Sequence, residues 1–404
     1  MATGGRSGYQ GGDLQTTRDG DMASSNVGAM ATLREESALI GGALTTLVLM
    51  TVGSAWFALL GQPVPTAGLF VWIFAAMLWC AFGVVRHADG LAELLGEPYG
   101  TLILTLAVTA IEVALMAAIM LAGEDNPTLA RDTMMAVIMI VLNGVVGTAL
   151  LIGGLRHGEQ EFNLQGARTF LAVLIPLATM ALILPRFTKS TADPTLTPLQ
   201  EILFAAITIA LYATFLATQT RRHRAFFVQP GETDTAHHPS PEHGGDHGPT
   251  HGKPRSIPWH AVLLVLTLLP IILLSEKLAA LVEFGVARLA APEALGGVLV
   301  AVLVLSPEGL AALGAARANR IQRSVNICLG SALATIGLTV PAVLAISVVT
   351  GHPIVLGLGD TEIVMLVLTL LLSMLTFGAV RTNMLQGAVH LVIFVVYVVL
   401  VFNP

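Results

Sequence analysis

Eleven long apolar stretches constrain the fold of this chain more than any other feature. A helix needs about 20 apolar residues to cross roughly 30 Å of hydrocarbon, and each stretch is close to that length. The stretches lack the apolar–polar alternation that is typical of membrane barrel strands. The sequence therefore predicts an all-α integral membrane protein with about 11 transmembrane helices. They cover residues 37–60, 67–86, 100–122, 133–155, 168–186, 199–219, 257–275, 296–314, 325–349, 361–380 and 385–402.

The composition agrees with a chain whose main partner is the lipid bilayer. Hydrophobic residues make up 54% of the 404 positions and charged residues 11%, whereas soluble domains carry about 25% charged residues. The net charge of −6, without an extended basic stripe, does not support nucleic-acid binding. Cys80 and Cys328 both lie inside apolar stretches, which indicates two buried cysteines without a disulfide.

The basic residues in the loops predict how the chain is oriented in the membrane. If the N-terminus is cytoplasmic, 15 of the 20 Lys and Arg residues fall on the cytoplasmic side. Cytoplasmic loops of membrane proteins carry an excess of these residues. The sequence therefore predicts an N-terminus inside and, with an odd number of spans, a C-terminus outside.

A polar, His-rich segment divides the chain into two halves of five spans each. Because five is odd, the halves are expected to lie in opposite orientations, as inverted repeats do in many secondary transporters. Such repeats place the transport site near the midplane between them. The predicted organisation is a disordered cytoplasmic tail (1–36), an extra helix (37–60), a first repeat (67–219), a His-rich acidic cytoplasmic linker (220–256) and a second repeat (257–404).

Each half has one glutamate deep inside its second span, Glu112 in the first half and Glu308 in the second. A carboxylate at the centre of a membrane helix costs about 2.5–3.5 kcal/mol on insertion scales, so such residues usually face a cavity and a partner. Structural acids, hydrogen-bonded between helices, are the alternative interpretation. The matching positions favour a shared cation- and proton-binding site formed by both residues.

Helical geometry places hydroxyl groups beside Glu112. Thr105 precedes it by seven positions and Thr101 by eleven. At about 100° per residue, both threonines lie on the face of the helix that carries the carboxylate. We therefore expect Thr101 and Thr105 to contribute oxygen ligands.

The sequence around Glu308, LVLSPEGLAAL, predicts further ligands. Pro307 removes a backbone donor inside the span, so carbonyl oxygens near Glu308 are expected to be free to coordinate an ion. Ser306 adds a hydroxyl. In the next span, Ser331 and Thr335 continue with Thr339 as a stripe with a spacing of four, as a hydroxyl-lined helix face requires. Ordinary packing of small residues is the alternative for this stripe.

The predicted ligand set suits a hard cation. Ca²⁺ takes six to eight oxygen ligands, and carboxylates, hydroxyls and carbonyls supply them. Carboxylates removed from water also favour the protonated form. A cation and protons (H⁺) would then compete for one site, which gives a mechanism for obligatory exchange. The transported ions are the expected small partners, and no cofactor is expected.

Three segments resemble one transporter family. They are GEPYGTLILTLAVTAIEVAL (96–115), LSPEGLAALGAARANRIQRSVNICLGSALATIGLTVPAV (305–343) and GAVRTNMLQGAVHL (378–391). The chain resembles the bacterial ChaA-type calcium/proton antiporters, a branch of the cation/proton exchangers in the Ca²⁺:cation antiporter superfamily. This resemblance implies ten core helices in two inverted halves, one extra N-terminal helix, and Glu112 and Glu308 as the acids of the repeat motifs. It also implies location in the bacterial cytoplasmic (inner) membrane and leaves Na⁺/H⁺ and K⁺/H⁺ exchange open.

Several polar residues outside the central site have two interpretations each. Glu97, at the start of a helix, either complements the helix dipole or lies at an ion entry. His390 is interpreted as a packing histidine with satisfied hydrogen bonds, with a proton relay as the alternative. The linker histidines are interpreted as part of a solubilising segment, with weak metal binding or pH sensing as the alternative. They include His237, His238 and His243.

Other function classes remain as alternatives at this point. A monovalent Na⁺ or K⁺/proton antiporter would use the same two acids. An intramembrane hydrolase could also use paired buried acids, but no recognisable nucleophile accompanies them. An ion channel would require a selectivity-filter segment, which the sequence does not indicate. The sequence thus favours exchange of cytoplasmic Ca²⁺ for protons by alternating access and assigns no oligomeric state.

Overall fold

The structure, a computed structural model, describes most of the chain. Residues 1–34 of the expected disordered tail (1–36), Glu97 and the predicted linker histidines His237, His238 and His243 lie outside the described residues, whereas residues 35 and 36 are described and Glu36 is buried. The described ranges are 35–57, 62–95, 99–121, 127–191, 194–227, 256–351 and 353–403.

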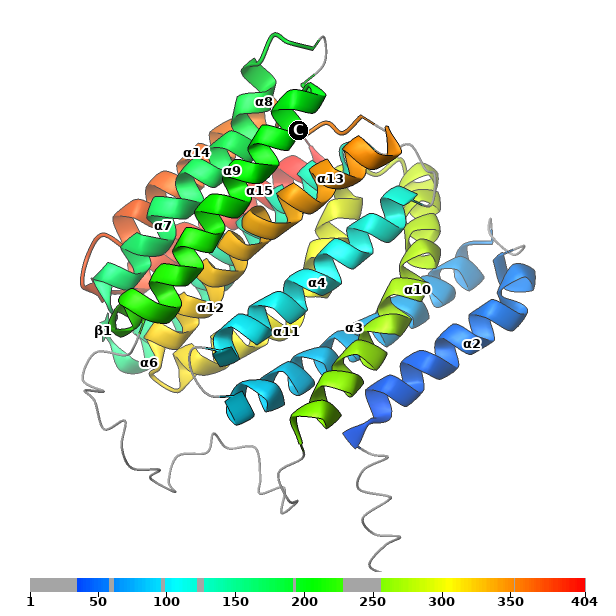
Figure 1. The fold of residues 1–404 in the computed structure, drawn as a ribbon, viewed down its shortest axis with the longest axis horizontal. Coiled ribbons are helices and arrows are strands. Elements are labelled where there is room, and N and C mark those ends of the chain that lie inside the picture. Colours follow the sequence, from blue (N-terminus) through cyan, green and yellow to red (C-terminus); the bar gives the residue numbers. More distant parts are fainter. Residues whose placement is uncertain are drawn as a thin grey trace, which may run out of the picture.

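The described chain folds into a helical bundle (Figure 1), which confirms the expected fold class. Within these residues, eight helices are long and apolar enough to cross a membrane. The apolar helices α2, α4 and α14 bring the total to eleven. The extra N-terminal helix is α2 (Ser37–Phe57).

The first repeat consists of five spanning segments, three of which contain a π-helical turn. A π-helical turn inserts one residue into the helical register and is frequent at functional sites. The elements are α3 (Pro63–Leu95), α4 (Tyr99–Leu121), α5 (Leu129–Met139), η1 (Ile140–Val145), α6 (Val146–His157), α7 (Leu164–Ala178), η2 (Thr179–Ile183), α8 (Leu184–Phe187), α9 (Pro198–Ala217) and η3 (Thr218–Arg222), followed by the short 3₁₀ helix η4 (Arg224–Phe227).

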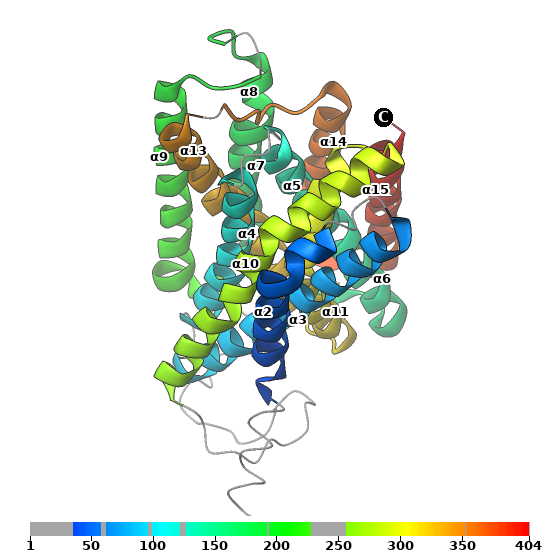
Figure 2. The same cartoon turned by 90° about the vertical axis from the view of Figure 1, so that its right-hand side faces the viewer.

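The second repeat has five corresponding segments in the same order, and its third segment also contains a π-helical turn. The elements are α10 (Ile257–Leu289), α11 (Ala294–Arg317), α12 (Ile321–Ala334), η5 (Thr335–Thr339), α13 (Val340–Thr350), α14 (Asp360–Thr376) and α15 (Met384–Phe402). With five spans in each half, the second half enters the bundle in the opposite direction. The start of α2 and the C-terminus consequently lie at opposite ends of the bundle (Figures 1 and 2).

The acidic helices α4 and α11 lie between two groups of helices (Figure 1). One group contains α2, α3 and α10, which pack against one another and face the viewer in Figure 2. The other group contains α7, α9, α14 and α15. Because α4 and α11 each contact α3 and α12, the middle of the bundle is where both repeats meet.

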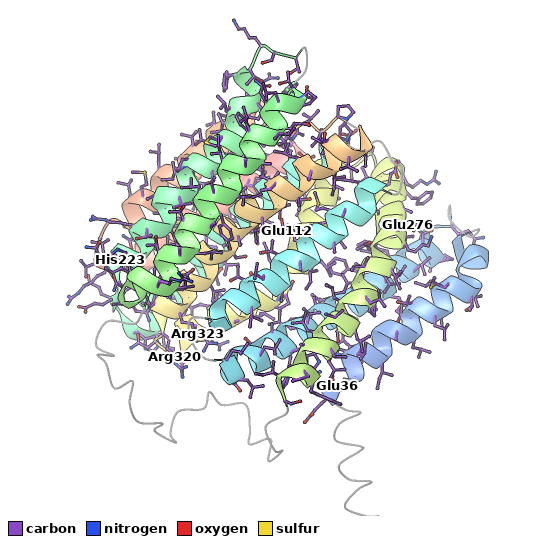
Figure 3. All side chains as sticks on the ribbon, viewed as in Figure 1. Glu36, Glu112, His223, Glu276, Arg320 and Arg323 are labelled. Atoms are coloured by element: carbon purple, nitrogen blue, oxygen red, sulfur yellow. The ribbon has the colours of Figure 1, made fainter. Side chains whose placement is uncertain are left out.

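A polar cluster fastens α2 to the first helix of each repeat. The carboxylate of Glu36, just before α2, accepts hydrogen bonds from Arg86 at 2.9 Å and from His87 at 3.0 Å. The other ring nitrogen of His87 lies 3.3 Å from Nδ1 of His260 in α10. Glu36 and His87 are both buried. This cluster joins α2, α3 and α10 at one end of the bundle, where Figure 3 labels Glu36.

A two-stranded antiparallel sheet joins a loop of each repeat. Strand β1 (Gln160–Glu161) pairs with β2 (Arg381–Thr382), with Glu161 opposite Arg381. Nε of Arg381 donates a 2.9 Å hydrogen bond to Glu161. Directly after β2, Asn383 caps α15 by accepting a hydrogen bond from the backbone of Gln386. The sheet thus fixes where the last helix begins.

Helices α6 and α15 cross at a contact that requires glycine. A Cβ atom on Gly387 would lie 2.6 Å from the backbone nitrogen of Leu151 and 2.7 Å from the carbonyl oxygen of Gly147. Both neighbours are backbone atoms, so neither helix can accept a side chain there without moving. Small residues at such crossings let membrane helices approach closely.

We expect Gly387→Ala to destabilise the protein by about 1–3 kcal/mol, the usual cost of forcing extra atoms into a packed contact. The measurement is a thermal unfolding curve of the purified protein in detergent. Gly314→Ala is the matched control, because a Cβ atom at Gly314 has no neighbour within 4 Å. Equal melting temperatures for the two variants would contradict the close crossing.

Candidate cation and proton site

The two central glutamates lie inside the bundle, one on each side of the repeat interface. Glu112 is in the middle of α4 and is 2% exposed, and Glu308 is in the middle of α11 and is 6% exposed. Figure 3 shows Glu112 near the centre of the molecule. The two carboxylates are close enough to interact electrostatically. The fold therefore brings together the two acids that the sequence singled out.

The third span of the second repeat supplies hydroxyl groups to Glu112. Thr335 Oγ1 donates a 2.8 Å hydrogen bond to Glu112 Oε2. Thr339 faces the same carboxylate without forming a hydrogen bond of normal geometry, and its hydroxyl has no other partner in the described part of the chain. Both threonines belong to η5, so the π-helical turn presents them side by side to α4.

Pro341 removes one backbone donor just after η5. A proline has no N–H to donate to the carbonyl four residues earlier, which here belongs to Gly337. The α-helical ladder is therefore interrupted inside the segment that becomes η5 (Thr335–Thr339). An irregular turn therefore lies beside the helix that carries Glu112.

Glu308 has a less polar environment. The Ser331 hydroxyl lies beside its carboxylate. The rest of a small pocket against Glu308 is largely hydrocarbon. The pocket is lined by Val141, Val145, Leu305, Glu308, Gly309, Ile327, Cys328 and Ser331.

Three oxygen atoms of this site are buried without a hydrogen-bond partner among the described residues. They are Glu112 Oε1, Glu308 Oε2 and Thr339 Oγ1. Buried polar atoms in native proteins nearly always have a partner, and leaving one unpaired costs about 1–3 kcal/mol. A cation between the acids would coordinate these oxygen atoms, and a proton on one carboxylate would remove its charge and supply a donor for a neighbouring oxygen. The arrangement therefore has the chemistry of a site that binds one or the other.

Two hydroxyls that the sequence places near the acids do not bond to them in the structure. The Ser306 hydroxyl donates to the backbone carbonyl of Val302 at 2.5 Å. Thr105 is half-buried two turns before Glu112 and forms no hydrogen bond to it in the described chain. Thr101 lies in the first turn of α4, and its side chain is outside the described part. Their role as ligands stays a prediction.

The role of Pro307 in leaving carbonyls near Glu308 free for an ion stays a prediction. Helix α11 continues without a break from Ala294 to Arg317. Pro307 removes the donor for one carbonyl, that of Leu303, because the helical partner lies four residues earlier. The irregular backbone lies instead in η1 and η5, beside the acidic helices.

His390 and Asp89 are two further polar residues whose surroundings the structure defines. His390 is fully buried, with Nδ1 3.0 Å from Asn143 Oδ1 and Nε2 3.0 Å from the Thr376 hydroxyl. It therefore has the satisfied hydrogen bonds expected of a packing histidine. Asp89, exposed on α3, is close enough to Glu308 to interact electrostatically. The residues predicted for ion entry or regulation, Glu97, His237, His238 and His243, lie outside the described residues.

The bundle of two five-helix repeats with paired acids between them defines a secondary ion transporter fold. The family model described as "Sodium/calcium exchanger protein" matches residues 65–221 and 259–403. The chain belongs to this family, which confirms the resemblance drawn from the sequence. Because the family consists of transporters, membership disfavours the intramembrane hydrolase alternative.

Two individual relatives and one solved structure are similar to the chain over most of its length. The chain is 41% identical over 377 residues to the sodium-potassium/proton antiporter ChaA of Escherichia coli K12, covering 93% of this chain and 98% of that protein. It is 27% identical over 260 residues to a Ca²⁺/H⁺ antiporter of Aphanothece halophytica, covering 62% and 68%. The structure of native YfkE has the same fold, with a TM-score of 0.68 at 20% identity, covering 91% of this chain and all of that one. The protein is therefore a multi-pass membrane protein of a bacterial antiporter family.

Proposed function

We propose that this protein is a secondary active antiporter that exchanges cytoplasmic Ca²⁺, Na⁺ or K⁺ for entering protons. The site consists of Glu112 and Glu308 and is exposed to each side of the membrane in turn. The observation that carries this proposal is the pair of buried carboxylates where the two repeats meet. Each has one oxygen atom without a hydrogen-bond partner in the part of the chain that the structure describes. The proposed location is the bacterial cytoplasmic membrane, with the N-terminus inside and the C-terminus outside.

Exchange follows from competition for the same oxygen atoms. A cation between the two carboxylates compensates their charge, and protons on the carboxylates do the same. Without either, two like charges remain buried in a region of low dielectric constant, which is the costly state. The site therefore changes sides readily when loaded with a cation or with protons, and reluctantly when empty. This preference couples the two flows.

The hydroxyl groups of η5 support binding of a dehydrated cation. Thr335 is already bonded to Glu112, and its oxygen retains a lone pair for an ion. Among the described residues, Thr339 Oγ1 has no hydrogen-bond partner that an ion would have to displace. Hard cations prefer such oxygen ligands. The names of the relatives support both classes of cation, because one is a sodium-potassium/proton antiporter and another a Ca²⁺/H⁺ antiporter.

The proposal is tested with purified protein in liposomes that hold an imposed pH gradient. Ca²⁺, Na⁺ and K⁺ are added separately, and proton movement is followed with a pH-sensitive dye. Collapse of the gradient on addition of at least one cation is the expected result. A gradient that stays intact with all three cations, from protein shown to be folded and incorporated, would reject cation/proton exchange and reopen the channel interpretation.

A further inference from the structure

The third span of each repeat contains one π-helical turn, and the two turns pack against opposite acidic helices. Segment η5 contacts α4, which carries Glu112, and η1 contacts α11, which carries Glu308. Each half thus has a π-helical turn in its third span, and each turn packs against the acidic helix of the other half. The side chains that the two turns present to the two acids can be compared.

The two turns present opposite chemistry to the two acids. Segment η5 presents the Thr335 and Thr339 hydroxyls to Glu112. Segment η1 presents Val141 and Val145, which line the pocket against Glu308. The Val145 side chain reaches α11 one residue after the acid, because its Cγ2 lies 3.5 Å from the position of a Cβ atom on Gly309. The turn η5 thus presents hydroxyls to Glu112, whereas η1 presents methyl groups to Glu308, whose hydroxyl neighbour Ser331 comes from α12.

The polar side chain of η1 does not change this contrast. The segment has the sequence IVLNGV, in which Asn143 is the sole residue with polar side-chain atoms. Its Nδ2 donates to Thr369 Oγ1 at 2.8 Å, and its Oδ1 lies 3.0 Å from His390 Nδ1. Both partners belong to α14 and α15, away from α11. Asn143 is therefore engaged elsewhere, and the side chains that η1 presents to the Glu308 pocket are hydrocarbon.

We propose that Val141 and Val145 are specificity-determining residues that disfavour Ca²⁺ relative to Na⁺ and K⁺. This inference rests on the proposed function and selects the cation class for that site. Ca²⁺ takes six to eight oxygen ligands, and the two valines line the Glu308 pocket without offering an oxygen. The cost of removing water from an ion also rises with the square of its charge in the Born treatment. Fewer ligands therefore penalise the divalent cation more than a monovalent one.

The test replaces each valine by threonine, which has nearly the same shape and adds one hydroxyl. Val141→Thr, Val145→Thr and the double variant are compared with the natural protein in the liposome assay, with Ca²⁺ and Na⁺ dose responses. The expected result is a Ca²⁺-to-Na⁺ ratio of kcat/KM that rises roughly 2- to 10-fold, the range for one added hydrogen-bonding group. An unchanged ratio in the singles and in the double variant would overturn the proposal.

Two further variants separate specificity from general effects. Val146→Thr is the matched control, because Val146 is a buried valine next to Val145 that does not line the pocket. The same rise in this control would also overturn the proposal. Thr335→Val makes the reciprocal change beside Glu112, and we expect it to lower the Ca²⁺-to-Na⁺ ratio. If the threonine variants do not fold, the test rests on Thr335→Val. An unchanged or raised Ca²⁺-to-Na⁺ ratio of kcat/KM in that variant would then count against the proposal.

Cation binding is measured separately, so that a variant that folds but does not transport can still be tested. The shift in melting temperature of the purified protein with added Ca²⁺ or Na⁺ reports binding, because a ligand of the folded state stabilises it. The ratio of the two shifts is expected to change in the same direction as the transport ratio. If the natural protein transports none of the cations, the proposed function fails. If it transports them and the ratios stay fixed, the assignment of the valines alone fails.

Discussion

Glu308→Gln is expected to reduce cation-driven proton movement to the level of protein-free liposomes. Glutamine keeps the size of the side chain but carries no negative charge and cannot gain and lose a proton near neutral pH. Because Glu308 faces a largely hydrocarbon pocket, no neighbouring side chain there can replace its charge. The measurement is the liposome assay with Ca²⁺, Na⁺ and K⁺.

Two controls accompany the Glu308 variant. Ser306→Ala changes the same turn of α11 but removes a hydroxyl bonded to the backbone of Val302, so exchange is expected to persist. Glu201→Gln changes another buried acid, one that accepts a 2.9 Å hydrogen bond from Ser347, and is also expected to keep exchange. Normal exchange by Glu308→Gln itself would remove this residue from the mechanism.

Glu112→Gln is expected to abolish exchange to the same extent, with little change in local structure. The amide oxygen of glutamine can still accept the hydrogen bond from Thr335, which is 2.8 Å long in the natural protein. What is lost is the charge that compensates the cation and binds the returning proton. Initial rates of proton movement and incorporation into liposomes are measured on the same preparations.

Glu112→Asp distinguishes charge from geometry at this position. Aspartate keeps the carboxylate but is shorter by one methylene, so it retreats from Thr335 and from the centre of the bundle. We expect slow exchange with a raised KM for the cation. Equal activity of the glutamine and natural proteins would show that Glu112 is a structural acid.

The spanning helices were predictable from length and hydrophobicity, but their ends were less so. The second span was expected at 67–86 and the seventh at 257–275, whereas α3 ends at Leu95 and α10 at Leu289. The extensions contain charged residues that an apolar pattern excludes. Helix formation does not require apolar residues, because alanine, leucine and glutamate all favour it. Hydropathy therefore locates the membrane-crossing part of a helix and misses its polar continuation.

The central acids were predictable because matching positions in two halves are visible in one sequence. The ligands around them were less accessible. Ser306 is two positions before Glu308, so the two side chains point about 200° apart on a helix, which the sequence already implies. The stripe of Ser331, Thr335 and Thr339 indicated a hydroxyl face. Which acid each hydroxyl serves depended on helix packing.

Features created by contacts between distant segments left little trace in the sequence. The cluster of Glu36, His87 and His260 joins the residue before α2 to α3 and α10. In the sequence, the valines of η1 cannot be distinguished from ordinary apolar residues of a membrane span. Their position beside Glu308 becomes visible when the two π-helical turns are compared in the fold. Tertiary packing thus decides which apolar side chains border the site.

The most direct test of the central claim is proton release on cation binding. Purified protein in weakly buffered detergent solution is mixed with Ca²⁺, Na⁺ or K⁺ while the pH is recorded. The natural protein is expected to release protons with a saturable dependence on cation concentration. The folded double variant Glu112→Gln/Glu308→Gln is expected to release none. Equal release from both proteins would show that cation and protons do not compete for these two carboxylates.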